Sequence, residues 1–172
     1  MKKRISINGF GRIGRTSLRA LLEKKNCTVV AINDLASPSI LAHLFKYDTN
    51  HGKFQGTIEV NNTSIIINGH TIQVFSQKNP ADLPWNTLNI DTVLESTGFF
   101  TQKIQATMHL DAGAKKVIIS APGQGNIPTI VLGVNDHNLQ DNEKIISNAS
   151  RTTNCLAPMV KVINDSFGIE KG

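Results

Sequence analysis

The chain has 172 residues, of which 40% are hydrophobic and 18% charged, so it is long enough to bury a core and has a globular composition. No apolar run approaches the roughly 18 residues that span a bilayer, so we expect no membrane segment. The basic residues at 2–4 lead into a strand pattern, so we expect no signal peptide. Cys27 and Cys155 are too few for a disulfide framework, and we predict free thiols in a reducing cytoplasm.

The net charge of +5 raises the question of nucleic-acid binding. The basic residues are scattered along the chain, and one Trp and one Tyr give no platform on which bases could stack. A mild basic excess also suits a domain that binds an anionic dinucleotide. We therefore do not expect a dedicated nucleic-acid-binding protein, and no metal site is indicated either.

The chain opens with a short apolar strand that runs directly into Gly9, Gly11 and Gly14, and helical spacing follows at once. The first glycine allows a tight turn, the second lets backbone approach a pyrophosphate, and the third lets the helix pack on the strand. The free N–H groups at the start of that helix would face the phosphates. The same triplet also occurs in ordinary strand-to-helix turns, so the surrounding sequence must distinguish a dinucleotide site from such a turn.

The context favours a dinucleotide site. A second parallel strand is predicted at 28–32, and it ends beside Asp34, twenty residues past Gly14. A carboxylate at this position would hold the ribose diol of the adenosine and would repel a 2′-phosphate. We therefore expect NAD, rather than NADP, to bind here.

Strand and helix patterns alternate along most of the chain, which predicts an α/β fold with a Rossmann-type, doubly wound, mostly parallel sheet. A helix is expected from Ser37 and Pro38, with its apolar face at positions 40, 41, 44 and 45. Another helix is expected to start at Thr101 as N-cap and to end near Ala112. Further strands are predicted at 91–95, 116–120, 129–132 and 144–147.

Three short β-rich runs interrupt this alternation, at 57–60, 64–67 and 71–75. Asn68 and Gly69 form a strong tight-hairpin signal between the last two. We therefore predict a small antiparallel insertion at about 57–75. At the other end of the chain, apolar residues between Leu156 and Phe167 fall on one helical face, with Pro158 expected in its first turn.

Several runs closely resemble glyceraldehyde-3-phosphate dehydrogenase. They include Leu-Glu-Ser-Thr-Gly-Phe-Phe-Thr at 94–101 and Thr-Thr-Asn-Cys-Leu-Ala-Pro at 152–158. The complete set of matching runs lies at 7–15, 31–34, 46–52, 84–85, 94–101, 119–122, 147–150 and 152–158. Their order over the whole chain identifies it as a member of that family. The resemblance implies an NAD-binding domain at 1–149 and the start of a catalytic domain at 150–172.

The resemblance also implies roles for individual residues. Arg12 and Ile13 would meet the pyrophosphate, together with the glycine turn, and Thr97 and Ser120 would lie along the nicotinamide. Lys78 stands where the family usually has Arg, so the charge is kept but the planar fork is lost.

This sequence lacks the residues that carry out catalysis in the family. Its nucleophilic Cys is replaced here by Arg151, a guanidinium that stays protonated and cannot attack a carbonyl. The sequence ends about halfway through a family member, before the family's catalytic His and substrate-phosphate Arg. In the family, the residues that correspond to Ser150 and Thr152 lie near the inorganic phosphate site. Arg151 could strengthen anion binding there, or its side chain could simply point into solvent. We therefore expect a chain that binds NAD but does not oxidise glyceraldehyde 3-phosphate with phosphate.

Other interpretations stay open. The chain could be a non-catalytic protein that binds NAD or a partner, because its last helical face from Leu156 to Phe167 needs a cover, which self-association could also supply. Erythrose-4-phosphate enzymes share much of the same pattern. The substitution at Arg151 and the short length could be natural or deliberate.

Overall fold

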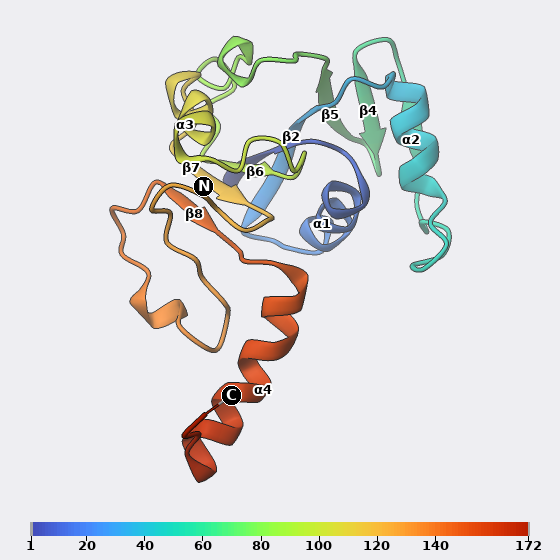
Figure 1. Cartoon of the computed structure of the whole chain (residues 1–172). Coiled ribbons are helices and arrows are strands. Elements are labelled where there is room, and N and C mark those ends of the chain that lie inside the picture. Colours follow the sequence, from blue (N-terminus) through green and yellow to red (C-terminus); the bar gives the residue numbers. More distant parts are fainter. Residues whose placement is uncertain (1, 172) are drawn as a thin grey trace.

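A computed structural model describes residues 2–171 and contains one sheet with the strand order β3-β4-β5-β2-β1-β6-β7-β8 (Figure 1). The parallel part of the sheet is built from β1 (Lys3–Asn8), β2 (Cys27–Asn33), β5 (His70–Phe75), β6 (Thr92–Glu95), β7 (Lys116–Ile119) and β8 (Ile145–Ser147). Two antiparallel strands, β3 (Ile58–Val60) and β4 (Ser64–Ile67), extend it at one edge. The predicted α/β, mostly parallel sheet is confirmed.

Strand order reverses at β1, which pairs in parallel with β2 on one side and with β6 on the other. The chain runs outward in one direction through β2 and β5, and later in the other direction through β6, β7 and β8. Loops leaving the carboxyl ends of β1 and its neighbours therefore diverge and open a crevice between them. This topological switch point positions the candidate site.

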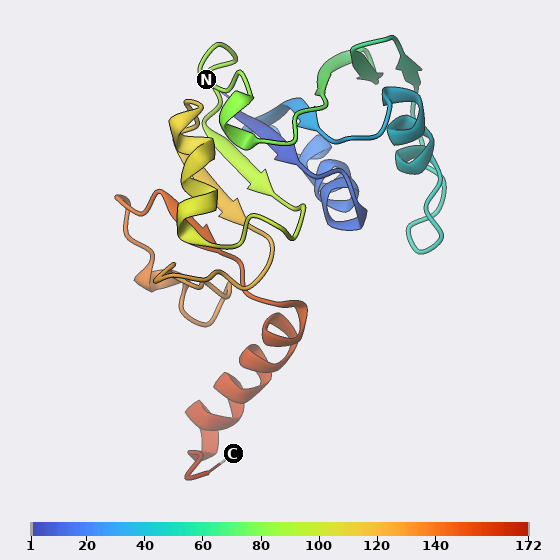
Figure 2. The same ribbon diagram turned by 45° about the horizontal axis from the view of Figure 1, so that its top comes forward.

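Helices cover both faces of the sheet. On one face lie α1 (Arg12–Leu22) and α2 (Pro38–Lys46), whose buried Leu18, Leu41 and Phe45 share a core cluster with Ile7 and Ile32. The opposite face carries α3 (Lys103–Asp111) and the short 3₁₀ turn η1 (Pro80–Asp82), which contact each other and are coloured yellow and green in Figure 2. A second 3₁₀ turn, η2 (Asp136–Asn138), lies in the long connection between β7 and β8.

The small antiparallel part differs from its prediction in one respect. The hairpin turn is confirmed, since Asn68 and Gly69 both have positive φ angles, of 49° and 78°. However, β5 pairs with β4 in antiparallel fashion and also with β2 in parallel fashion. Only β3 and β4 are therefore additional to the parallel sheet, and β5 is one of its own strands.

Three other local predictions are wrong for tertiary reasons. The run 129–132 forms only a single bridge, between Thr129 and Ser147, because the chain turns away and leaves Leu132 exposed. On α2, the positions that pack inward are 41, 42 and 45, whereas Ile40 and Leu44 face solvent. The N-cap of α3 is Gln102 rather than Thr101, because Gln102 and Gln105 form a reciprocal capping box.

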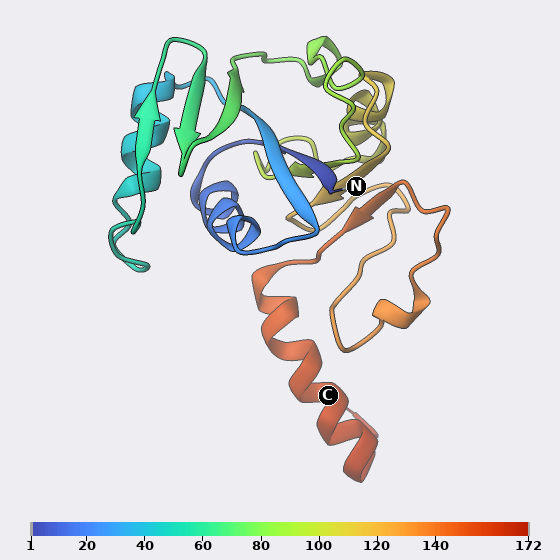
Figure 3. The same cartoon turned by 180° about the vertical axis from the view of Figure 1, so that it is seen from behind.

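The last helix, α4 (Arg151–Phe167), projects away from the sheet and its covering helices (Figures 1 and 3). None of its residues is buried. It starts at Arg151, so Pro158 lies in its interior and not in its first turn as predicted, and Gly168 caps its C-terminal end. The apolar face is real, and its five members are between 39% and 87% exposed: Leu156, Met159, Val160, Ile163 and Phe167.

Candidate functional site

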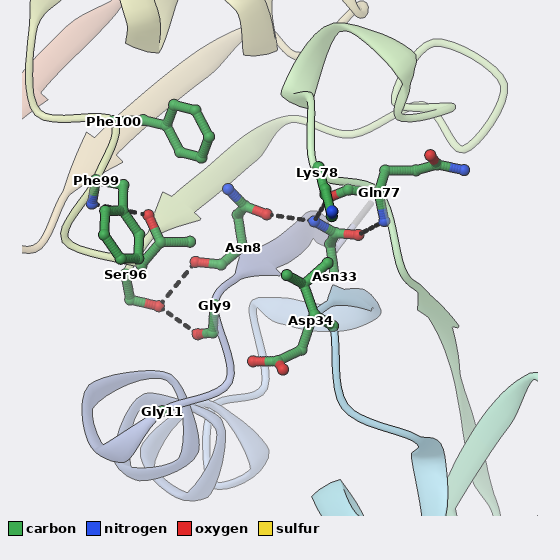
Figure 4. A pocket seen from close by; sticks show the side chains of 12 residues that line it. Asn8, Gly9, Gly11, Asn33, Asp34, Gln77, Lys78, Ser96, Phe99 and Phe100 are labelled. Carbon is green, nitrogen blue, oxygen red and sulfur yellow. Dashed lines mark hydrogen bonds between the residues drawn. The ribbon is translucent and has the colours of Figure 1, made fainter.

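A cleft of about 370 Å³ opens at the carboxyl ends of β1, β2 and β6, where the strand order reverses (Figure 4). Its walls come from segments far apart in the sequence, namely the turns after β1, β2, β5 and β6. The lining residues are Asn8, Gly9, Gly11, Asn33, Asp34, Leu35, Gln77, Lys78, Ser96, Thr97, Phe99 and Phe100.

The glycine turn after β1 shows why each glycine is needed. A Cβ at Gly9 would lie 2.7 Å from the backbone nitrogen of Thr97, and Gly9 has a φ of 88°. A Cβ at Gly14 would lie 2.3 Å from the carbonyl oxygen of Gly9, so only glycine lets α1 pack this closely. Gly11 differs from both, because a Cβ there would meet no atom within 4 Å. The space above Gly11 is therefore available to a ligand.

The start of α1 fits an anionic group. Gly11 is its N-cap and supplies no side chain to accept the first N–H groups of the helix. No acidic residue stands in the first turn, so the positive end of the helix dipole is not neutralised there. Backbone donors with room in front of them are what a pyrophosphate requires.

Asp34 follows β2 and lies beside this turn. Its Oδ2 accepts a hydrogen bond of 2.7 Å from the backbone N–H of Phe10, and its Oδ1 accepts one of 3.0 Å from Ala36. Each carboxylate oxygen can accept a second hydrogen bond, so the group can still hold a hydroxyl pair. The structure thus joins Asp34 and the glycine turn at one end of the cleft.

Lys78 lies on the same side of the cleft, in the turn after β5. The preceding residue is fixed by two hydrogen bonds to the Asn33 side chain. The backbone N–H of Gln77 donates to Asn33 Oδ1 at 2.8 Å, and Asn33 Nδ2 donates to the carbonyl of Gln77 at 2.9 Å (Figure 4). The lysine is therefore held at the cleft by its backbone, with no planar fork to make paired bonds.

A second depression of about 260 Å³ continues the first, and Ser96 and Thr97 line both. Its lining residues are Ile13, Ser96, Thr97, Gly98, Ser120, Ala121, Pro122, Ser150 and Arg151. The structure therefore brings together four positions that the sequence separates widely: Ile13, Thr97, Ser120 and Arg151. They form a continuous path with the first cleft.

The start of α4 is shaped by its cap. Ser150 Oγ accepts from the backbone N–H of Thr153 at 3.0 Å and lies 2.9 Å from Thr152 Oγ1. The residue before it, Ala149, has a φ of 58°, a strained value for a residue with a Cβ. This turn directs the helix start, with Arg151, to the rim of the second depression.

Not every predicted site residue lines a depression. Arg12 and Thr152 are exposed and border neither one, and Gly14 is buried in the packing of α1 on β1. All the other predicted positions line one of the two depressions: Gly9, Gly11, Ile13, Asp34, Lys78, Thr97, Ser120, Ser150 and Arg151.

Sequence reasoning missed a buried polar network beneath the cleft. It contains Asn8, Asn33, Glu95 and His109, all at most 5% exposed, and the indole N–H of Trp85. One signal was available, since polar residues end three adjacent apolar strands at Asn8, Asn33 and Glu95. Their mutual contacts, however, depend on strand register.

Two kinds of feature are absent from residues 2–171. No group of three or more His, Cys, Asp or Glu side chains in that range could hold a metal ion. No helix in the described part of the chain is long and apolar enough to cross a membrane. Both cysteines are free, as predicted.

Comparison with known proteins agrees with this geometry. Residues 3–103 match the family described as "Glyceraldehyde 3-phosphate dehydrogenase, NAD binding domain". The chain belongs to this family. NAD is therefore its cofactor, and the matched range includes the glycine turn, Asp34, Lys78 and Thr97.

Full-length relatives extend the similarity to the second depression. Glyceraldehyde-3-phosphate dehydrogenase of Clostridium acetobutylicum is 57% identical over 169 residues, which are 98% of this chain and 51% of the relative. That of Priestia megaterium is 51% identical over 173 residues, covering the whole chain and 52% of the relative. The cytosolic enzyme of Trypanosoma brucei brucei is 48% identical over 169 residues, 98% of this chain and 51% of the relative. The chain thus spans about half the length of these relatives.

Proposed function

We propose that this chain binds NAD along the path formed by the two depressions and does not catalyse phosphorylating aldehyde oxidation by itself. The observation that carries the proposal is the convergence of the glycine turn, the start of α1 and Asp34 at one switch point. The free space above Gly11 fits the cofactor's pyrophosphate, because a bound phosphate needs backbone N–H groups and no side chain in front of them.

The proposed orientation follows from the residues at each end of the path. The adenosine ribose would lie against Asp34, and Lys78 would add a positive charge beside the adenosine half. The pyrophosphate would cross Gly11, Arg12 and Ile13 at the start of α1. The nicotinamide would then reach the second depression, between Thr97 and Ser120. When bound there, NAD supplies a hydride acceptor.

Arg151 is the reason to expect no turnover. It lines the second depression at the position where the family has its nucleophilic Cys. A guanidinium has five N–H donors and no lone pair with which to attack the aldehyde carbon. The family's substrates, glyceraldehyde 3-phosphate and inorganic phosphate, could still bind as anions near Ser150 and Thr152. The Ser150 hydroxyl oxygen already accepts a hydrogen bond from the backbone N–H of Thr153, so it has fewer hydrogen bonds left to make with a bound anion.

The domain division and cellular location are part of the same proposal. We place the cofactor domain at residues 1–149 because no residue of α4 is buried against it, and the family resemblance assigns 150–172 to the start of a catalytic domain. A cytoplasmic location is consistent with the two free thiols and with the name of the cytosolic relative.

Calorimetric titration of the 172-residue chain with NAD tests the binding part. We expect saturable one-to-one binding and weaker binding of NADP, whose 2′-phosphate would meet Asp34. A folded chain that binds neither nucleotide would contradict the proposal. Spectrophotometric assay of NADH formation from aldehyde, NAD and phosphate tests the inactive part. A rate well above that of buffer would contradict it.

A second role, association through α4, is favoured by one observation. Five apolar side chains from Leu156 to Phe167 face solvent on one side of this helix. A contiguous apolar stripe of this kind is usually covered by protein. We propose that a second copy or another protein covers it in this chain. Light scattering after size-exclusion chromatography should detect self-association that a Leu156→Glu variant loses, and a monomer at high concentration would contradict cover by a second copy.

A further inference from the structure

A single buried carboxylate lies beneath the cofactor cleft. Glu95 ends β6 and is only 1% exposed, and it does not line the cleft itself. Its Oε2 accepts hydrogen bonds from Asn8 Nδ2 at 2.6 Å and from His109 Nε2 at 2.9 Å. Its Oε1 accepts from the backbone N–H of Thr97 at 2.8 Å and from the Thr97 hydroxyl. Four donors therefore converge on one buried charge.

One branch from Glu95 fixes the wall formed after β6. Because the hydroxyl hydrogen of Thr97 is given to Glu95, the Thr97 oxygen is left as an acceptor for the backbone N–H of Phe99, at 3.1 Å. Thr97 borders both depressions, and Phe99 lines the first. The position of this wall thus depends on contacts made to a carboxylate behind it.

A second branch fixes the opposite wall. The Asn8 side chain donates to Glu95 through Nδ2, so its Oδ1 is turned to accept from Asn33 Nδ2 at 2.7 Å. Asn33 in turn holds the backbone of Gln77 by the two hydrogen bonds described above, one residue before Lys78. Figure 4 shows this chain of contacts running across the floor of the cleft from Asn8 to Gln77.

The far side of Glu95 is supported by His109 of α3. The indole N–H of Trp85 donates to His109 Nδ1 at 3.0 Å. Since an indole N–H can only donate, Nδ1 is the acceptor, and the ring hydrogen of neutral His109 is on Nε2, facing Glu95. Both rings are fully buried. Every donor around the carboxylate is therefore oriented, and none is free to turn toward another acceptor.

We propose that Glu95 is a positioning residue for the cofactor. It ties the Thr97 wall and the Gln77 wall to one point, so the cleft has its width and shape before NAD arrives. A cleft that is already ordered loses less entropy on binding, and it therefore binds more tightly. This inference rests on the proposed NAD site and deepens it, because Glu95 acts only through residues that line the cleft.

Glu95→Gln is the central variant, because it keeps the shape and replaces one acceptor oxygen by an NH₂ group. Whichever way the amide turns, that NH₂ group faces two donors, so at least one branch loses its acceptor. Glu59→Gln is the matched control, since Glu59 is exposed on the edge strand β3. Thermal unfolding of both variants measures how much of any change in hydrogen exchange or NAD affinity comes from a loss of stability.

Hydrogen exchange of the ligand-free protein tests whether the contacts of Glu95 hold the two cleft walls in place. We expect the backbone amides of at least one branch, Thr97 and Phe99 or Gln77, to exchange roughly tenfold faster or more in Glu95→Gln. The control should leave them unchanged. Unchanged protection of Thr97 and Phe99 together with Gln77 would overturn the inference. This measurement does not involve NAD, so it tests whether Glu95 holds the two cleft walls even if the proposed function fails.

Titration well below the unfolding temperature then tests the consequence. NAD should bind folded Glu95→Gln roughly tenfold more weakly. AMP, which occupies only the adenosine half, should also lose affinity if the Gln77 amide exchanges faster in this variant, and it should bind normally if that amide does not. A lower melting temperature with unchanged affinity for NAD would mean a purely structural role and would overturn the proposal. If unchanged wild-type chain binds no NAD, it is the proposed function that fails.

His109→Phe keeps the proposal testable if Glu95→Gln does not fold. It removes one of the four donors at a position that lines neither depression. His109 also packs edge-on against the ring of Phe100, which lines the cleft, and an aromatic replacement preserves that packing, so a change in NAD affinity reports on the lost bond to Glu95. We expect a smaller loss than in Glu95→Gln, with faster exchange at Thr97 and Gln77. Wild-type affinity and wild-type exchange in this variant would overturn the inference.

Discussion

The carboxylate of Asp34 and the backbone of Phe10 are joined by a hydrogen bond of 2.7 Å, which ties the end of β2 to the glycine turn after β1. Asp34 therefore has two tasks in the proposed site. It holds the turn that faces the pyrophosphate, and it presents its remaining lone pairs to the ribose.

Replacing Asp34 by Asn should weaken NAD binding roughly tenfold, because the amide has one acceptor oxygen for the N–H groups of Phe10 and Ala36 and for the ribose. Preference for NAD over NADP should narrow as the negative charge is removed. Titration with both nucleotides measures both effects. Asp82→Asn, on the exposed turn η1, serves as control and should bind like the wild type.

The glycines of the turn offer a matched pair of variants. Gly14→Ala should destabilise the fold by about 1–3 kcal/mol, since its Cβ would lie 2.3 Å from a backbone oxygen. Gly11→Ala should leave the melting temperature nearly unchanged, because its Cβ meets no protein atom within 4 Å. It should nevertheless weaken NAD binding, since the methyl group would occupy the space proposed for the pyrophosphate. Normal NAD affinity in Gly11→Ala would argue against that placement.

Asp91 should make stability depend on pH in the acid range. The backbone N–H of Arg4 and the ammonium group of Lys115 hold the pKa of Asp91 below its usual value of 3.8. A lowered pKa in the folded state means that the unfolded chain binds protons first as pH falls. The stabilisation is thus present above pH of about 4 and is lost as the pH falls further. Denaturant unfolding should show Asp91→Asn less stable than wild type at pH 7, by about 1 kcal/mol, and the gap should close toward pH 2.

Pro158 should be a weak point in α4. Proline in a helix interior removes one backbone hydrogen bond and crowds the carbonyl one turn earlier, at Asn154. Pro158→Ala should therefore favour the helix by as much as about 3 kcal/mol locally. Circular dichroism and hydrogen exchange of residues 154–160 should show a more persistent helix. The melting temperature of the sheet domain should not change, because no residue of α4 is buried.

The helix start at Arg151 should activate a thiol placed there. In an Arg151→Cys variant, the N-terminal end of α4 should lower the pKa of the introduced thiol, so alkylation by iodoacetamide at pH 7 should be severalfold faster than at Cys155. Cys155 lies one turn deeper and serves as the internal comparison. Equal rates at the two thiols would mean that the helix end does not supply the activation that we propose.

Local chemistry was enough to predict much of this protein. Gly9, Gly11 and Gly14 carry their backbone requirements in the residues themselves, and Asp34 is placed by the length of one strand-helix-strand unit. The alternation of strands and helices predicted the α/β fold, and the glycine turn together with Asp34 predicted a dinucleotide site. The resemblance carried by the motifs added the family, which the comparisons confirm.

Tertiary structure decided the features that depend on distant partners. Thr129 to Leu132 had the composition of a strand, but a strand also needs a neighbour in register, and only one bridge forms. Ile40 and Leu44 had the spacing of a buried face, yet α2 turns another side to the core. The contacts among Asn8, Glu95 and His109 join positions up to 101 residues apart. Such contacts follow from sheet register and helix rotation, and neither is encoded in any single stretch of sequence.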